Sequence, residues 1–65
     1  MNAAALDARV WRSIRRAPDS RADEIARRLG DVDVYDVSLA LKRLRRSKRV
    51  KSRGKTRATT YRVTV

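Results

Sequence analysis

The sequence contains no cysteine and no histidine, and only two glycines and one proline occur among its 65 residues. Without cysteine no disulfide can form, and without either residue type a Cys/His zinc site, a Ser-His-Asp triad and a Cys-His dyad are all excluded. The two glycines, Gly30 and Gly54, are too few for a glycine-rich phosphate-binding loop. We therefore expect a protein that is not an enzyme and that binds no metal ion and no cofactor.

Long apolar runs are also absent. No stretch approaches the length of about 18 apolar residues that marks a transmembrane helix, and the N-terminus lacks the pattern of a secretory signal. We expect a soluble protein with no membrane contact and no small-molecule substrate. Its compartment is expected to be the cytoplasm, in association with the nucleoid, or the nucleus in a eukaryotic or viral host.

Charge is divided sharply along the chain. Residues 1–36 hold seven acids and seven arginines and are neutral, whereas residues 37–65 hold eleven Lys or Arg and no acid. The whole net charge of +11 therefore belongs to the C-terminal part of the chain. Such an asymmetry costs self-repulsion in a compact state and predicts a polyanionic partner.

The first part of the chain predicts one helix over residues 3–16. Asn2 is a suitable N-cap for it, and Pro18 ends it because the residue before a proline is driven out of the α region. Apolar residues at three- and four-residue spacing form one stripe that we expect to be buried: Ala3, Leu6, Val10, Ile14 and Ala17. Trp11 lies at the edge of that stripe, where we expect it to pack half-exposed against a neighbouring element.

A second, shorter helix is predicted over residues 21–29. Ser20 followed by Asp23 fits a capping pattern, and negative charge is favoured in this first turn by the helix dipole. Gly30 is expected to supply the left-handed C-terminal cap. The apolar face consists of Ala22, Ile25, Ala26 and Leu29.

A third helix is predicted over residues 34–47, with Asp31 or Asp33 as its cap. Its buried face consists of Val37, Ala40, Leu41 and Leu44. The opposite face carries Tyr35, Leu39, Lys42 and Arg46, with Ser38 and Arg45 on one flank and Asp36 and Arg43 on the other.

Beyond this helix the apolar spacing changes from helical to alternating, which predicts a β-hairpin. We expect strands over residues 48–53 and 58–64, with Gly54 supplying the positive φ that a tight reversal needs. The inward positions are Val50, Tyr61, Val63 and Val65. The expected fold is therefore α+β and mostly helical, with three helices and a C-terminal hairpin in a single domain over residues 1–65.

The order of these elements and several local patterns resemble the winged helix-turn-helix family of DNA-binding domains. The likeness rests on the segment ADEIARRLG at 22–30, on the spacing of Val37, Leu41, Leu44 and Val50, and on GKTRATTYRVTV at 54–65 as a wing tip and return strand. The turn between Gly30 and Val37 is one residue longer than the commonest family turn, which affects where the third helix begins. A weaker likeness, through Leu39, Leu41, Lys42, Leu44 and Tyr61, links the third helix and the wing to the globular domain of linker histones.

The resemblance implies that the third helix enters the major groove of double-stranded DNA and that the wing follows the phosphates and the minor groove. The helix residues expected to bind DNA are Tyr35, Ser38, Leu39, Lys42, Arg43 and Arg46. The wing residues expected to bind DNA are Lys48, Arg49, Lys51, Arg53, Lys55, Arg57 and Arg62. Lys42 and Arg46 suit guanine edges, and Leu39 suits a thymine methyl group, a partner protein or the stem of a long neighbouring side chain.

The expected function is sequence-specific binding of double-stranded DNA by a small transcription regulator. An architectural or nucleoid protein with little sequence preference is the alternative within this class, because the third helix has many cations but no Asn or Gln to read bases. A protein-interaction or RNA-associated winged helix, with Trp11, Tyr35 and Leu39 as its contact patch, is the alternative from another class. We expect a monomer in free solution that either remains single or dimerises on DNA.

Overall fold

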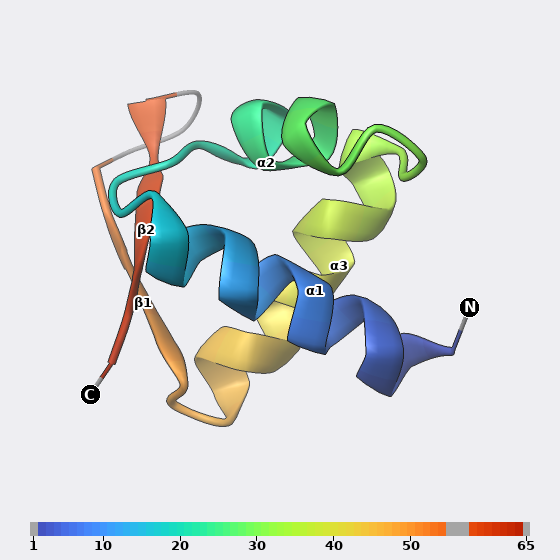
Figure 1. Ribbon diagram of the computed structural model, residues 1–65. Helices are drawn as coiled ribbons and strands as arrows, with labels where there is room; N and C mark the ends of the chain where they lie inside the picture. The colour runs from blue at the N-terminus through green and yellow to red at the C-terminus, as the bar shows by residue number, and fades with distance from the viewer. Residues whose placement is uncertain (1, 55–57, 65) are drawn as a thin grey trace.

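The computed structural model contains three helices followed by two antiparallel strands (Figure 1). They are α1 (Ala3–Arg16), α2 (Ala22–Leu29), α3 (Val34–Arg46), β1 (Val50–Arg53) and β2 (Thr60–Val63). The predicted α+β fold of three helices and a C-terminal hairpin is confirmed. The structure describes residues 2–54 and 58–64, so the predictions made for Lys55, Arg57 and Val65 lie outside the described residues.

The bounds of α1 agree with the prediction at both ends. The side-chain oxygen of Asn2 accepts a hydrogen bond of 2.8 Å from the backbone N–H of Ala5, which satisfies one of the free donors of the first turn. At the other end Ala17 is the C-cap, and Pro18 follows directly. The helix is therefore bounded by local signals alone.

The start of α2 differs from the prediction. Its N-cap is Arg21, whose backbone N–H donates to the carboxylate of Glu24 at 2.8 Å. The hydroxyl of Ser20 instead donates to the carbonyl of Ala17 at 2.6 Å, and Ser20 is buried. The predicted Ser20 cap is wrong because this hydroxyl closes the connection to α1. Gly30 does end α2, with a φ of 83°.

Neither end of α3 is capped by the expected side chain or by glycine. Asp33 occupies the N-cap position, but its carboxylate makes no capping hydrogen bond. At the C-terminus the N–H of Arg49 donates to the carbonyl of Leu44, and the N–H of Lys48 donates to the carbonyl of Arg45. This pair of bonds is a Schellman motif. Lys48 adopts its left-handed conformation, with a φ of 63°, where glycine is usual.

The hairpin has one inward and one outward face. Val50 lies opposite Val63 and Ser52 opposite Tyr61 on the inner face, whereas Lys51 lies opposite Arg62 and Arg53 opposite Thr60 on the outer face. Both strands are shorter than predicted. β1 begins at Val50 because residues 48 and 49 belong to the helix cap, and β2 spans Thr60–Val63 in place of residues 58–64. Gly54 has a φ of 97°, and a Cβ there would lie 3.0 Å from the carbonyl oxygen of Ala58. Glycine is therefore required at this turn.

The connection between α1 and α2 pairs with the free edge of β2, which the sequence did not indicate. The N–H of Tyr61 donates to the carbonyl of Ser20, and the N–H of Asp19 donates to the carbonyl of Tyr61, both at 3.0 Å. Asp19 has a φ of 64°, a conformation that Asp tolerates better than most residues. These bonds attach the hairpin to the helices and satisfy the backbone N–H and C=O of Tyr61 on the edge of β2 that does not pair with β1.

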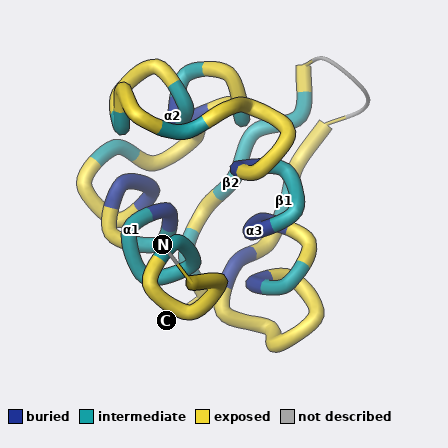
Figure 2. Tube along the Cα trace, turned by 90° about the vertical axis from the view of Figure 1, so that its right-hand side faces the viewer, coloured by how far each residue is buried: buried dark blue, intermediate teal, exposed yellow. Residues whose placement is uncertain are grey.

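One hydrophobic core joins the three helices to the first strand (Figure 2). Its buried members are Val10, Ile14, Ile25, Val37, Ala40, Leu41, Leu44 and Val50. All four residues predicted for the inner face of α3 are among them. Ala3 is exposed, so the buried stripe of α1 is confined to the middle and end of that helix. α3 packs against both α1 and α2, and its remaining face is left toward solvent.

Candidate nucleic-acid interface

The solvent-facing side of α3 is centred on three side chains. Tyr35, Lys42 and Arg46 are exposed, and Tyr35 has an exposed fraction of 65%. Ser38 is half-buried on one flank, where it lines a hollow of about 450 Å³ between the start of α2 and residue Tyr61 of β2. The four residues lie on the side of α3 away from the core, as predicted.

Two other predicted residues of α3, Leu39 and Arg43, lie on the opposite flank. Both are half-buried and line a hollow of about 390 Å³ against the first turns of α1. The guanidinium of Arg43 donates to the carboxylate of Asp7, with Nη2 2.8 Å and Nε 3.0 Å from Oδ1. This hydrogen bond raises the pKa of Arg43. Arg43 therefore has a partner within the chain, and Leu39 is less open than its position on the helix suggests.

Cations line the outer face of the hairpin. Lys51, Arg53 and Arg62 are exposed, and Lys51 lies directly opposite Arg62. Like charges at opposite positions on neighbouring strands repel. The carboxylate of Asp19 offsets this repulsion, since it accepts hydrogen bonds from Nε and Nη2 of Arg62 at 2.7 Å and 2.8 Å. These bonds hold the pKa of Asp19 below its ordinary value.

The residues that link α3 to β1 contact α1. The guanidinium of Arg49 lies 5.3 Å from the ring centroid of Trp11, and that of Arg15 lies 5.5 Å from it. Both distances are in the range of cation–π attraction. Trp11 is half-buried against the core, which confirms its predicted packing. Arg49 and its neighbour Lys48 are both exposed, and Arg49 contacts Trp11 of α1.

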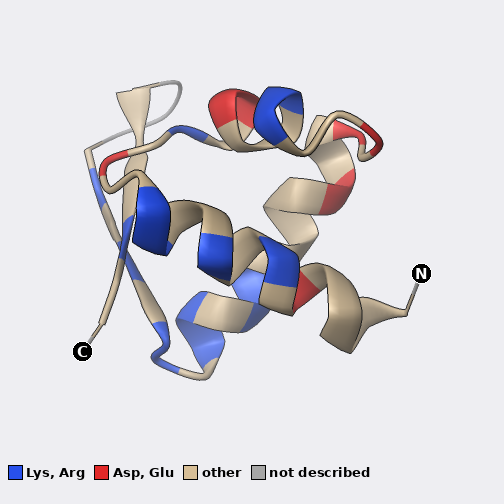
Figure 3. Ribbon diagram, viewed as in Figure 1, with Lys and Arg blue, Asp and Glu red and all other residues tan. Residues whose placement is uncertain are grey.

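Five of the seven acids lie in α2, in the α2–α3 turn and at the start of α3 (Figure 3). The other two are Asp19, which pairs with the hairpin, and Asp7, which pairs with α3. Arg9 pairs with Asp31 at 2.7 Å, and Arg21 lies 3.4 Å and 3.5 Å from Asp23 and Glu24. Apart from Arg49, which lies against Trp11, six cations of α3, its cap and the hairpin form no ion pair within residues 2–54 and 58–64: Lys42, Arg45, Arg46, Lys48, Lys51 and Arg53. We call the surface formed by Tyr35, Ser38 and these six cations the α3–hairpin face.

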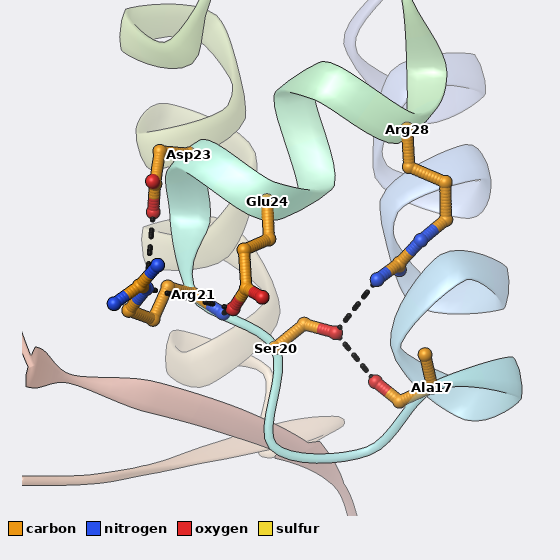
Figure 4. Close-up of polar contacts among 6 residues, drawn as sticks. All are labelled: Ala17, Ser20, Arg21, Asp23, Glu24 and Arg28. Carbon is orange, nitrogen blue, oxygen red and sulfur yellow. Dashed lines mark hydrogen bonds and ion pairs between the residues drawn. The ribbon is translucent and has the colours of Figure 1, made fainter.

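Arg28 holds α1, α2 and their connection together (Figure 4). Its Nη1 donates to the hydroxyl and carbonyl oxygens of Ser13 at 2.6 Å and 3.2 Å, and its Nη2 donates to the hydroxyl of Ser20 at 3.1 Å. Both serines are buried. Because the connection carries Asp19 and pairs with β2, this arginine also fixes where the hairpin lies. The sequence pattern did not identify Arg28, since its partners are neutral and distant along the chain.

The geometry describes a helix with an open basic side and, beside it, a strand pair with a basic outer face. In the described part of the chain, no helix combines the length and apolar character that crossing a membrane requires. Comparison of the chain with models of protein families, with curated proteins and with solved structures found no match.

Proposed function

We propose that this chain binds double-stranded DNA, with α3 in the major groove and the hairpin as a wing along the phosphates. The observation that carries the proposal is the position of Lys42 and Arg46 on the open side of α3, where neither has an acidic partner among the described residues. Most acids elsewhere are paired with arginine, so this surface keeps its positive charge. The major groove has the width of an α-helix, and its base edges are the part of DNA that specifies sequence.

The side chains of α3 divide by what they can contact. Arg46 has a planar fork that fits the O6 and N7 acceptors of guanine, and Lys42 supplies a single flexible donor to the same edge. Ser38 both donates and accepts, so it suits several bases. These three residues are our candidates for reading sequence. A small transcription regulator is the function that such a reading helix favours.

The hairpin is proposed to contact the phosphate backbone through Lys51 and Arg53. Both are exposed on the outer face and neither forms an ion pair with a described residue. Phosphate contacts of this kind position a protein on the duplex and contribute much of its affinity. Arg62 and Arg49 have partners within the chain, so we assign them a supporting role in holding the wing.

A second candidate function is that of an architectural protein with little sequence preference. It is favoured by the number of candidate phosphate contacts relative to candidate base contacts. Three residues on the open side of α3, Ser38, Lys42 and Arg46, are our candidates for base contacts, while the cap and hairpin add Lys48, Lys51 and Arg53 for phosphates. Affinity that comes mostly from phosphates does not depend on sequence. The two candidates share one binding face and differ in the ratio of specific to nonspecific affinity.

The proposal is tested by the affinity of purified protein for a labelled DNA duplex, measured by fluorescence anisotropy. We expect Arg46→Gln to weaken binding by about tenfold or more, because a bidentate contact to guanine contributes about 1–3 kcal/mol. Arg27→Gln is the matched control, since both arginines are exposed in the last turn of a helix. Equal effects of the two substitutions, or no binding of the wild type at low salt, would overturn the proposal.

A further inference from the structure

A groove between α1 and α2 is lined by four arginines. It has a volume of about 590 Å³, and its lining consists of Arg9, Arg12, Arg16 and Arg28 together with Ser13, Ala17 and Leu29. Among the described residues, none from α3 or the hairpin lines it. The groove is therefore separate from the α3–hairpin face.

Two of these arginines stand close together without compensation. Arg12 and Arg16 are one helical turn apart on α1, and like charges at this spacing destabilise a helix. Both are exposed, and neither forms an ion pair with any residue in the described ranges. Arg9 differs from them because its guanidinium is paired with Asp31. The positive charge of the groove thus increases from Arg9 toward Arg16.

Arg28 is a cation that is already held in place. Among the described residues it donates to the hydroxyl and carbonyl oxygens of Ser13 and to the hydroxyl of Ser20, all of them neutral, so its charge is not cancelled. Figure 4 shows the contact with Ser20. A guanidinium fixed in this way loses little conformational freedom when it binds an anion. Together with Arg12 and Arg16 it forms a preorganised site for a ligand with several negative charges.

We propose that this groove binds the phosphate backbone of a second DNA duplex, so that one molecule bridges two duplex segments. The inference rests on the proposed function, because the first duplex must occupy the α3–hairpin face. A guanidinium group can donate two parallel hydrogen bonds to the oxygens of one phosphate. Every charged residue that lines the groove is an arginine. Once the protein is bound to one segment, neighbouring segments of the same polymer are present at high effective concentration.

The inference is tested by a capture assay with the full chain. An unlabelled duplex is immobilised on beads, protein is added in increasing amounts, and retention of a fluorescent second duplex is measured. We expect retention to rise and then fall, because excess protein fills each duplex separately. In a parallel anisotropy assay the affinity for a single duplex is measured, and sedimentation checks that the free protein is a monomer.

Two matched double substitutions separate the two faces. Arg12→Gln with Arg16→Gln removes two charges from the groove, and Lys42→Gln with Arg46→Gln removes two charges from α3. We expect the first pair to lower capture of the second duplex by about tenfold while affinity for a single duplex changes by less than about threefold. The second pair is expected to lower both.

Four other results of these assays would overturn the bridging inference. Binding of a single duplex without any capture of a second overturns the bridging inference and leaves the proposed function standing. Undiminished capture by the Arg12→Gln, Arg16→Gln variant also overturns it, and assigns bridging to protein association. If both variants lose single-duplex affinity equally, the groove and the α3–hairpin face form one continuous site, and the inference of two separate sites fails. If a labelled poly-glutamate peptide binds the groove and no duplex is captured, the partner is an acidic protein and the inference fails.

Discussion

The guanidinium of Arg62 on β2 donates two hydrogen bonds, of 2.7 Å and 2.8 Å, to the carboxylate of Asp19 in the α1–α2 connection. The same connection pairs by backbone with Tyr61. One acid therefore ties the hairpin to the helices and cancels one of the charges on its outer face. Asp19 therefore stabilises the hairpin and at the same time lowers the positive charge that the proposed DNA partner would meet.

Substitution of Asp19 by Asn tests this relationship. Asn tolerates the left-handed backbone at this position, so the substitution removes the negative charge and keeps the turn. We expect a lower melting temperature and tighter binding to duplex DNA, because Arg62 becomes available to a phosphate. The slope of log K against log salt is expected to steepen by about 0.9 for one added contact.

Asp33→Asn is the control for that variant. It adds the same charge to the protein, but the Asp33 side chain makes no capping hydrogen bond and releases no arginine. We expect its effect on the salt slope to be the smaller of the two. Equal effects would mean that net charge alone matters and that the Arg62–Asp19 pair has no specific influence.

Acid is expected to destabilise the protein only at low pH. Hydrogen bonds from Arg62 and Arg9 hold the pKa values of Asp19 and Asp31 below the ordinary value of 3.8. As the pH falls toward 3.8, the unfolded chain therefore binds more protons than the folded chain. The stabilisation from these two pairs is lost as the pH falls through the lowered pKa values of the folded protein. With no histidine, no side chain has an ordinary pKa between about pH 5 and pH 7.

Thermal unfolding followed by circular dichroism checks this expectation. The melting temperature should be constant from about pH 7 to pH 5 and should decline below about pH 4. The Asp19→Asn, Asp31→Asn variant should start from a lower melting temperature and lose less on acidification. A decline already between pH 7 and pH 5 would show that other groups control stability.

Substitution of Lys48, the left-handed residue of the α3 cap, is expected to change stability and DNA binding in opposite directions. Lys48 has a φ of 63°, a conformation that costs a side-chain-bearing residue about 1–2 kcal/mol relative to the right-handed region. We expect Lys48→Gly to raise the melting temperature and to weaken DNA binding, since it relieves the strain and removes a cation. Lys48→Gln should weaken binding without the gain in stability. If glycine gives no gain, the left-handed cap is not strained.

Leu39 distinguishes DNA binding from a protein interface. Its side chain lines a hollow beside α1 and is half-buried, so it is poorly placed to act as the centre of a DNA contact. We expect Leu39→Asp to weaken duplex binding less than Lys51→Gln with Arg53→Gln, as measured by anisotropy. A larger effect of the leucine substitution, with the fold intact by circular dichroism, would favour the interaction-module alternative.

Much of the fold could be predicted because its signals are local. Asn2 and Pro18 bound α1, Gly30 ends α2, and Gly54 marks the hairpin turn. The apolar spacing identified the inner face of α3 because a helix repeats its faces at a constant angle. These features depend on residues a few positions apart, which a sequence shows directly.

Contacts between distant segments could not be predicted. Asp7 pairs with Arg43, which is 36 residues away, and Asp19 pairs with Arg62, which is 43 residues away. Fourteen arginines and seven acids allow many pairings, and only the packed structure selects among them. The sequence therefore predicted a basic helix and hairpin but not which of their cations keep their charge. For the same reason it did not show that Ser20 closes a turn instead of capping α2.

The salt dependence of duplex binding tests the central claim most directly. Four cations of the α3–hairpin face form no ion pair within the described ranges and are not assigned to base edges: Arg45, Lys48, Lys51 and Arg53. If each neutralises one phosphate, log K should fall against log salt with a slope of about −3.6. The Lys51→Gln, Arg53→Gln variant should reduce the slope by about 1.8. Absence of binding at low salt, or a slope that the variant leaves unchanged, would contradict the account.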